Sequence, residues 1–461
     1  MLSNVNNIDS AMTKINTILW ALLMLAGISP AAAAEPDDTL YLDNAELVFP
    51  EQYQRQRLID DAKVIFIGDD SERPPVDSVN SLMMRYYLDQ FRHFQDPKLP
   101  YFMFMSKDAN LAMGIGAQVR MRGWYDWHRA VPANGFSPYM IPIPVDPTKR
   151  RQLKATPAGS GFHLVLLGRN TLAKTFMAYV EGNFDGYNHV DFKLKKAYVI
   201  INDWTVGYAT STFADPDAEP PTIDGAGPNG DISKTNVLLR YMHTFRQKWT
   251  VAASLEFPGS NPQTDGTLTK KCNDYLPDFA ALGQYQWDGG ESHVRLSGLL
   301  RFIPYRDLVD NTNHTVPGWG LQLSTCFKTL PDLSVFGLVN VGRGHSSYTG
   351  DLSIDAYDLV TRKDRPGRLY APTSFAATLG LKYNFRPNVY SCVALAEQHY
   401  FPKDNPRDSQ YKYGLYGAVN VFWEMSPRIM VGAEYLIGKR MNFDRTSGSA
   451  NRIDALFQFS F

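Results

Sequence analysis

Apolar and polar residues alternate with a period of two along most of this chain. The last eleven residues show the pattern most simply, because every second residue from Ile453 to Phe461 is apolar, whereas Asp454, Gln458 and Ser460 lie between them and Arg452 precedes them. Side chains of a β-strand point alternately to its two faces, so this stretch is predicted to be a strand with one apolar and one wet face. Such a strand could belong to a soluble sandwich or to a membrane barrel.

The same alternation recurs in sixteen segments. They begin near Leu111, Phe162, Phe176, Phe192, Trp204, Asn236, Trp249, Phe279, His293, Trp319, Leu333, Phe375, Val389, Lys412, Ile429 and Asn451. Short links lie near Asn170 and at 202–203, 246–247, 288–290, 331–332, 386–387 and 425–427. Longer links lie between them, at 128–161, 185–190, 214–235, 257–278, 303–318, 344–374, 399–411 and 441–450.

This alternation of tight turns with long loops favours the membrane barrel, since a soluble sandwich has no reason to sort loop length by end. Residues 110–461 are therefore predicted to form an all-β membrane protein: a 16-stranded antiparallel transmembrane β-barrel with short periplasmic turns and long extracellular loops. A barrel of this size leaves an aqueous channel. By hydropathy alone, a mean hydropathy of -0.28 and 20% charged residues would indicate a soluble protein. Barrel strands give the same values, because they average a lipid face with a wet one.

The first 109 residues show a different pattern. Residues 1–34 are predicted to be a signal peptide, with Lys14 before an apolar core and Ala32 to Ala34 as the cleavage site, although an N-terminal membrane anchor is the alternative. Residues 35–109 are expected to be a periplasmic segment with a short strand at 64–68 and one amphipathic helix at about 75–95. This segment has 15 acidic and 8 basic residues, whereas residues 110–461 have 31 and 37.

With the apolar face toward lipid, the alternate positions point inward. The pore-lining basic residues predicted in this way are Arg120, Arg122, Lys193, Lys195, Arg240, Arg295 and Arg301. Arg or Lys facing lipid at mid-membrane costs about 2–4 kcal/mol, which leaves the interior as their location. These residues could only keep the channel wet, or they could concentrate anionic solutes.

The third long loop, 214–235, is rich in proline, glycine and acidic residues. Its acidic residues are Asp215, Asp217, Glu219, Asp224 and Asp231. It could be a surface loop. If it folds inward, as the third loop of porins typically does, it is a constriction whose acidic residues face the basic wall and create a transverse field.

Two residues interrupt the alternation. On the strand beginning at Phe192, the apolar face is predicted to contain Leu194, Tyr198 and Ile200, so that Lys196 would point to lipid. A subunit interface or a local β-bulge would accommodate this lysine. Glu397 is a similar exception near the extracellular end of its strand.

Catalytic and metal-binding signatures are absent from the sequence. Three cysteines without C-x-x-C spacing predict neither a disulfide framework nor a metal site, and the histidines lack the H-E-x-x-H spacing. We expect no enzyme activity, no cofactor and no nucleic-acid partner. Two alternatives remain: a barrel-embedded hydrolase that uses His345 beside Ser346 and Ser347, and a structural or binding barrel plugged by residues 35–109.

Five stretches between residues 162 and 245 have a distinctive order and spacing. They are YVEGNF at 179–184, LKKAYV at 194–199, WTVG at 204–207, STFAD at 211–215 and TIDGAGP at 222–228. In these stretches the chain resembles the DcaP-like porin family of outer-membrane channels. The resemblance implies a homotrimer in contact with outer-membrane lipid and lipopolysaccharide, and uptake of small anionic or zwitterionic solutes such as dicarboxylates. Lys193 and Lys195 would match the family's basic residue inside the barrel.

One departure from the family concerns the N-terminal segment. The family has a coiled-coil-like helix there, whereas residues 35–109 are interrupted by prolines and only 75–95 suits a helix–helix contact. Trimerisation through this segment and the preferred solute are therefore left open.

Overall fold

The computed structural model describes residues 63–67, 102–106, 110–168, 176–185, 191–246, 248–288, 292–404 and 406–461. The predicted signal peptide at 1–34 and the predicted helix at 75–95 lie outside the described residues. Within the described ranges, no helix is both long and apolar enough to cross a membrane.

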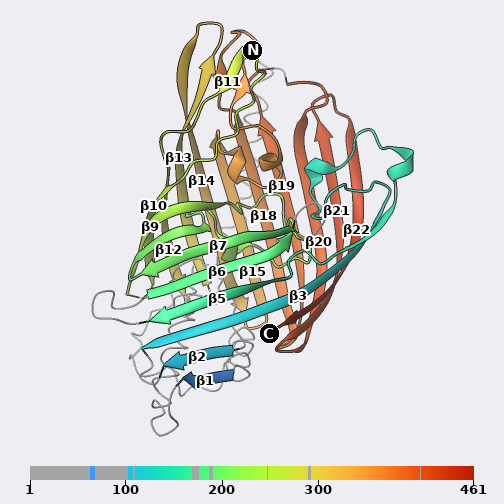
Figure 1. Ribbon diagram of the computed structural model, residues 1–461. Coiled ribbons are helices and arrows are strands. Elements are labelled where there is room, and N and C mark those ends of the chain that lie inside the picture. Colours follow the sequence, from blue (N-terminus) through green and yellow to red (C-terminus); the bar gives the residue numbers. More distant parts are fainter. Residues whose placement is uncertain are drawn as a thin grey trace. The chain divides into compact units, whose positions relative to one another are not determined.

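Sixteen strands form one closed antiparallel ring, which confirms the predicted barrel (Figure 1). They are β3 (Leu111–Trp127), β5 (Gly161–Gly168), β6 (Phe176–Asp185), β7 (Asp191–Ile201), β8 (Trp204–Thr210), β9 (Thr235–Phe245), β10 (Trp249–Glu256), β12 (Asp278–Trp287), β13 (Ser292–Asp307), β14 (Thr312–Leu330), β15 (Leu333–Arg343), β18 (Thr373–Arg386), β19 (Val389–Phe401), β20 (Tyr411–Ser426), β21 (Ile429–Asn442) and β22 (Ser447–Ser460). The C-terminal strand closes the ring on β3, from the pair Asn451–Trp127 to the pair Ser460–Gln118.

Burial alternates along each strand in the sense expected of a membrane barrel. On β10, Val251 and Leu255 point outward and are exposed, whereas Thr250, Ser254 and Glu256 point inward and are buried. The outer surface is thus apolar and the inner surface carries the polar side chains, which is the reverse of a soluble protein.

Shorter strands extend the ring. At the turn end, β2 (Phe102–Ser106) pairs with β3 beyond the reach of β22, and β1 (Lys63–Ile67) pairs in parallel with β2, which confirms the predicted short strand. At the loop end, β4 (Gln152–Thr156) pairs with β3 and β11 (Thr269–Lys271) with β13. A separate hairpin joins β16 (Val360–Thr361) to β17 (Leu369–Tyr370).

The connections agree with the sequence prediction at the turn end but differ at two loops. Asn202, Arg246 and Asp288 have positive φ angles, as tight hairpin turns require. The predicted loop at 303–318 is instead a hairpin that continues β13 and β14 to the pair Asp307–Thr312. Strand pairing persists because Ile303 and Tyr305 pack against Leu359 and Leu369 of a later loop.

The predicted loop at 441–450 is likewise mostly paired, since β21 and β22 stay in register to Met441–Ser447.

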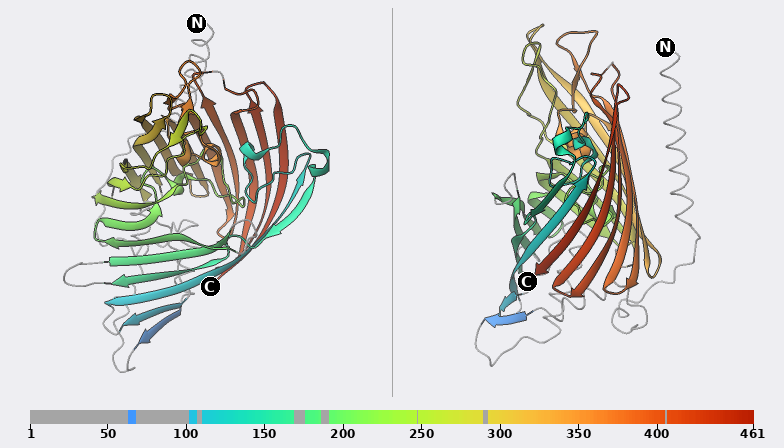
Figure 2. Two further views of the ribbon diagram at one scale, coloured as in Figure 1. Left: turned by 45° about the horizontal axis from the view of Figure 1, so that its top comes forward. Right: turned by 90° about the vertical axis from the view of Figure 1, so that its right-hand side faces the viewer.

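Three long connections fold against the inner wall of the barrel (Figure 2). We call them loop 1 (128–160), loop 3 (211–234) and loop 6 (344–372). Loop 1 packs Val131, Phe136 and Ile141 against the inner faces of β19 to β22. Loop 3 packs Phe213 and Ile232 against β12, β13 and loop 6. Short 3₁₀ turns shape these loops: η1 (Pro138–Met140), η2 (Pro147–Lys149), η3 (Pro216–Ala218), η5 (Ser346–Tyr348) and η6 (Asp351–Ile354).

Candidate functional site

Loop 3 begins at a buried carboxylate, Asp215, which contacts side chains of β13 and β14. Asp215, which is fully buried, lies 2.7 Å from Nη1 of Arg295 and 2.9 Å from Nε2 of His293, and its other contact is the hydroxyl of Ser324. Burial alone would raise the pKa of Asp215, but Arg295 and His293 hold it below its usual value. This ion pair therefore holds the start of loop 3 against the barrel wall.

The middle of loop 3 crosses to β18, β20, β21 and β3. The carbonyl of Pro221 accepts a 2.8 Å hydrogen bond from the Asn420 amide. Both oxygens of Glu434 accept hydrogen bonds from the loop backbone, at 3.0 Å from Ile223 N and 2.7 Å from Asp224 N. Asp224 then accepts a 3.2 Å hydrogen bond from Arg122. The loop thus spans the interior and has polar contacts on opposite walls.

The returning half of loop 3 is held by β15, β18 and loop 6. The Asn340 amide donates to the carbonyl of Gly230 over 2.8 Å, and the Thr378 hydroxyl donates to Asp231 over 2.7 Å. Burial raises the pKa of Asp231 to about 7. A β-bridge between Ile232 and Thr349 joins loops 3 and 6.

Two further buried arginines anchor the other loops. Arg301 contacts Asp278 on β12 at 3.0 Å and Asp358 of loop 6 at 3.2 Å. Arg452 lies 2.6 Å from Asp126 and also donates to backbone carbonyls of loop 1, including that of Asn134 at 3.0 Å. Each inward arginine of this kind fixes one loop to the wall.

Burial therefore separates the predicted pore-lining basic residues into two groups. Arg122, Arg240, Arg295 and Arg301 are at most 4% exposed, so they present little charge to an open channel. Arg120 is partly buried and donates to the carbonyl of Ile223 over 3.0 Å. We expected these arginines to be exposed to water in the channel, and the structure instead buries them under the loops. A buried guanidinium needs a carboxylate or carbonyl partner, which the loops supply.

Lys193 and Lys195 form the second group, and a β-bulge places them. On β6 and β7, Glu181 pairs with Lys196 whereas Gly182 pairs with Leu194, so Lys195 is the extra residue. Because Glu181 points inward and opposed residues share a face, Lys196 points inward as well. Of the two alternatives for Lys196, the local bulge is confirmed, and the prediction that Tyr198 and Ile200 face lipid is wrong.

The bulge reverses the alternation beyond it. Tyr198 and Ile200 are 3% and 4% exposed on the inner face, whereas Val199 and Ile201 are exposed outside. As a consequence, three of the four residues at 193–196 are lysines that face inward: Lys193, Lys195 and Lys196. Lys195 lies 3.1 Å from Glu181, and its side chain is 47% exposed.

The acidic residues of loop 3 also divide into a buried group and a more exposed group. Asp215, Asp224 and Asp231 are buried in the contacts described above, whereas Asp217 is exposed and Glu219 is partly exposed. Burial raises the pKa of Glu219, and Asp231, Asp215 and Asp217 raise it further, while Lys196 on β7 opposes them. Glu219 and Lys196 are therefore electrostatic neighbours, although they come from the loop and the wall.

The other exception, Glu397, is partly exposed on the outer face, 3.3 Å from His399. His399 stacks on Phe401 and Tyr413, so the pair lies in an aromatic cluster near the loop end.

His345 is not arranged as a catalytic base. It is fully buried, burial lowers its pKa to about 4, and neither ring nitrogen has a hydrogen-bond partner among the described residues. Ser346 donates to Asp358 instead. In the described part of the chain, no group of three or more His, Cys, Asp or Glu residues could hold a metal ion.

Sequence reasoning missed the neutral residues that hold loop 3, namely Asn340, Thr378, Gly380 and Asn420. Asparagine and threonine at inward positions look like any wet wall, so no local signal marks them. Gly380 matters because a Cβ there would lie 2.4 Å from Cβ of Pro220, so β18 has no room for a side chain at this contact with loop 3.

Comparisons with known proteins give a family and a set of similar solved structures. Residues 162–461 match the family model described as DcaP outer membrane protein. Among solved structures, the outer membrane channel DcaP of Acinetobacter baumannii is 21% identical, with a TM-score of 0.65 over 77% of this chain and 98% of that one. The loop L8 deletion mutant of OmpT of Vibrio cholerae is 11% identical, with a TM-score of 0.48 over 76% of this chain and 100% of that one.

An anion-selective porin from Comamonas acidovorans is 10% identical, with a TM-score of 0.48 and coverage of 76% of this chain and 100% of that one. A search of curated protein sequences finds no significant match.

Proposed function

The chain belongs to the DcaP outer membrane protein family, and from this premise we propose that it is a porin: a water-filled diffusion channel of the outer membrane for small, preferentially anionic solutes. Dicarboxylates are the proposed solute class. The proposal includes a cleaved signal peptide, an N-terminal segment in the periplasm and assembly as a homotrimer.

The observation that carries the proposal is the bulge at Lys195. It turns Lys193, Lys195 and Lys196 to the inner face within four residues, where regular alternation would direct one of them to lipid. Lys195 stays half exposed although it pairs with Glu181. The buried arginines are compensated by carboxylates, so these lysines supply the accessible positive charge that attracts anions.

Loop 3 supplies the opposite side of the proposed constriction. Its exposed acidic residue is Asp217, and the partly exposed Glu219 interacts electrostatically with Lys196 on β7. The narrow region then lies between η3 of loop 3 and the bulged strand. A field across it orients a solute that carries separated charges, and the lysine side favours solutes with two carboxylates.

Reversal potentials in planar bilayers under a salt gradient test the proposal. We expect an anion preference in the wild-type channel, reduced by Lys193→Ala/Lys195→Ala and increased by Asp217→Asn/Glu219→Gln. Lys439→Ala is the matched control, because Lys439 lies on the outer face of β21, opposite Leu415. A cation preference, or lysine and acidic variants that shift the potential in the same direction, would refute the selectivity mechanism.

A further inference from the structure

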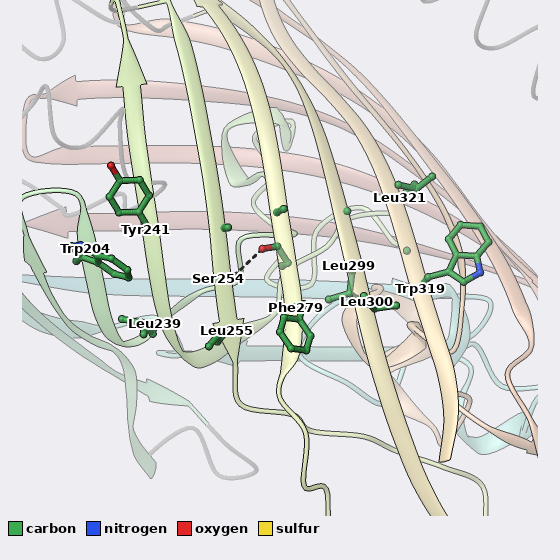
Figure 3. Close-up of a pocket in the computed structure, with 15 residues that line it drawn as sticks. Trp204, Leu239, Tyr241, Ser254, Leu255, Phe279, Leu299, Leu300, Trp319 and Leu321 are labelled. Atoms are coloured by element: carbon green, nitrogen blue, oxygen red, sulfur yellow. Dashed lines mark hydrogen bonds between the residues drawn. The ribbon is translucent and has the colours of Figure 1, made fainter. Parts of the chain in front are cut away.

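The outer surface of the barrel has an apolar groove of about 750 Å³ over β8 to β14 (Figure 3). Its floor is made of small outward residues, Ala253, Ala281 and Gly298, which are adjacent in strand register. On one side rise Leu255, Phe279 and Leu300, which are also in register with one another. The groove therefore runs across the strands, along the pairing direction.

The direction of this groove relative to the membrane follows from the strand ends. Its lower end is at Trp204, the first residue of β8 after a tight turn. Its upper end is at Trp319, which pairs directly with Arg343, the last residue of β15 before loop 6. Since barrel strands tilt by about 35–45°, the groove climbs toward the loop-side rim of the barrel, which it reaches at Trp319.

The upper part of the groove, from Leu239 to Trp319, corresponds in height to one leaflet. From Leu239 on β9 to Trp319 on β14 there are four strand spacings of about 4.8 Å, or about 19 Å. At a tilt of about 40° this climbs about 12 Å, less than half of the roughly 30 Å hydrocarbon core.

Arg343 gives the upper end of the groove a charge. Its side chain is exposed on the outer face, and its Nε donates to the Thr373 hydroxyl over 3.2 Å. Within the described part of the chain, Arg343 has no ion-pair partner. A cation at the rim above an apolar groove is complementary to a lipid that carries a phosphate above its acyl chains.

The shape of the groove favours a lipid over a second copy of the barrel. Two closed barrels meet along convex surfaces, so their raised side chains touch first and a recessed groove between them stays unfilled. A flexible acyl chain can follow a narrow groove across five strands. Filling it also restores the dispersion contacts that the small floor residues leave unmade.

We propose that this groove is a specific site for a phosphate-bearing lipid of the loop-side leaflet, with an acyl chain over Ala253, Ala281 and Gly298 and the phosphate on Arg343. The site is independent of ion selectivity. The lipid would lie on the outer face of β13 and β14, whose inner faces hold the start of loop 3.

Native mass spectrometry of the full-length, delipidated protein titrated with lipid A tests the site. We expect Ala281→Leu/Gly298→Leu and Arg343→Gln each to weaken lipid A binding about tenfold, and Arg343→Lys to retain most of it. A Cβ on Gly298 would meet only Leu321, at 3.8 Å, so filling the groove leaves the strands undisturbed. Ala281→Leu alone serves as the milder filling variant.

The same mass spectra measure lipid A binding by two control variants. Ala433→Leu and Lys439→Gln are outward changes on β21, away from the groove, and should bind lipid A as the wild type does. Inorganic phosphate should not compete at concentrations similar to those of lipid A, because the acyl chain contributes to binding. Equal lipid A binding by the groove variants overturns the proposal, as does a change in oligomeric state on filling the groove, which would mark it as a contact between copies.

Discussion

Neutralising Asp215 tests whether buried ion pairs hold loop 3 against the wall. Asp215 is fully buried and contacts Arg295 at 2.7 Å, His293 at 2.9 Å and the Ser324 hydroxyl. Asp215→Asn keeps the size of the side chain but leaves the buried guanidinium without its counter-charge. Breaking a buried pair in this way typically costs about 3–5 kcal/mol.

The expected change is at the lower end of that range. Arg295 still donates to Gln284 over 2.7 Å and to the carbonyl of Ala214 over 3.2 Å, so part of its charge stays solvated by protein dipoles. With about 1.4 kcal/mol per factor of ten, a loss of about 3 kcal/mol raises the open population of this part of the loop roughly 100-fold. The rest of loop 3 remains attached through Glu434 and Arg122.

Hydrogen exchange measured by mass spectrometry on peptides covering 211–220 is the assay. Exchange should accelerate in Asp215→Asn while peptides from β19 to β22 stay unchanged. The double variant Asp215→Asn/Arg295→Gln should exchange more slowly than Asp215→Asn, because removing both charges leaves no uncompensated ion. Asp364→Asn is the control, since its pair with Arg362 is solvent-exposed and contributes little.

Two results would contradict this reasoning. Unchanged exchange at 211–220 in Asp215→Asn would mean that the ion pair does not hold the loop. Additive effects in the double variant would mean that the two charges act independently.

Three other changes address the same loop and wall. Burial raises the pKa of Asp231 to about 7, well above the usual value for an aspartate, so the folded state holds its proton more tightly and docking of loop 3 should weaken as pH rises from about 4 to 7. Asp231→Asn should remove most of this pH dependence of exchange at 228–234. Gly380→Val should displace loop 3 at Pro220 and increase single-channel conductance, at a cost of about 1–3 kcal/mol of overpacking, whereas Gly283→Val, which meets nothing within 4 Å, should not. Deleting Lys195 should restore regular pairing of β6 and β7, leave thermal stability unchanged or higher, and reduce anion preference as Lys195→Ala does; lost folding would show that the bulge is structural.

The sequence by itself determined the barrel, because its evidence is repeated sixteen times. A period of two fixes which residues share a face, and turn length fixes which strands are neighbours, so closure from β3 to β22 followed from local patterns. The position of the bulge was also visible locally, since Lys196 could not face lipid without a large cost. Its consequence, that Tyr198 and Ile200 turn inward, required the pairing with β6.

The tertiary structure decided what the inward arginines do. From the sequence, Arg295, Arg301 and Lys195 are equivalent inward cations. Only the folded chain brings Asp215 to Arg295 across 80 residues and Asp358 to Arg301 across 57, because loops 3 and 6 fold back onto the wall. A loop's path depends on contacts with strands remote in sequence, such as Asn340, Thr378 and Asn420, and no local periodicity encodes those distances.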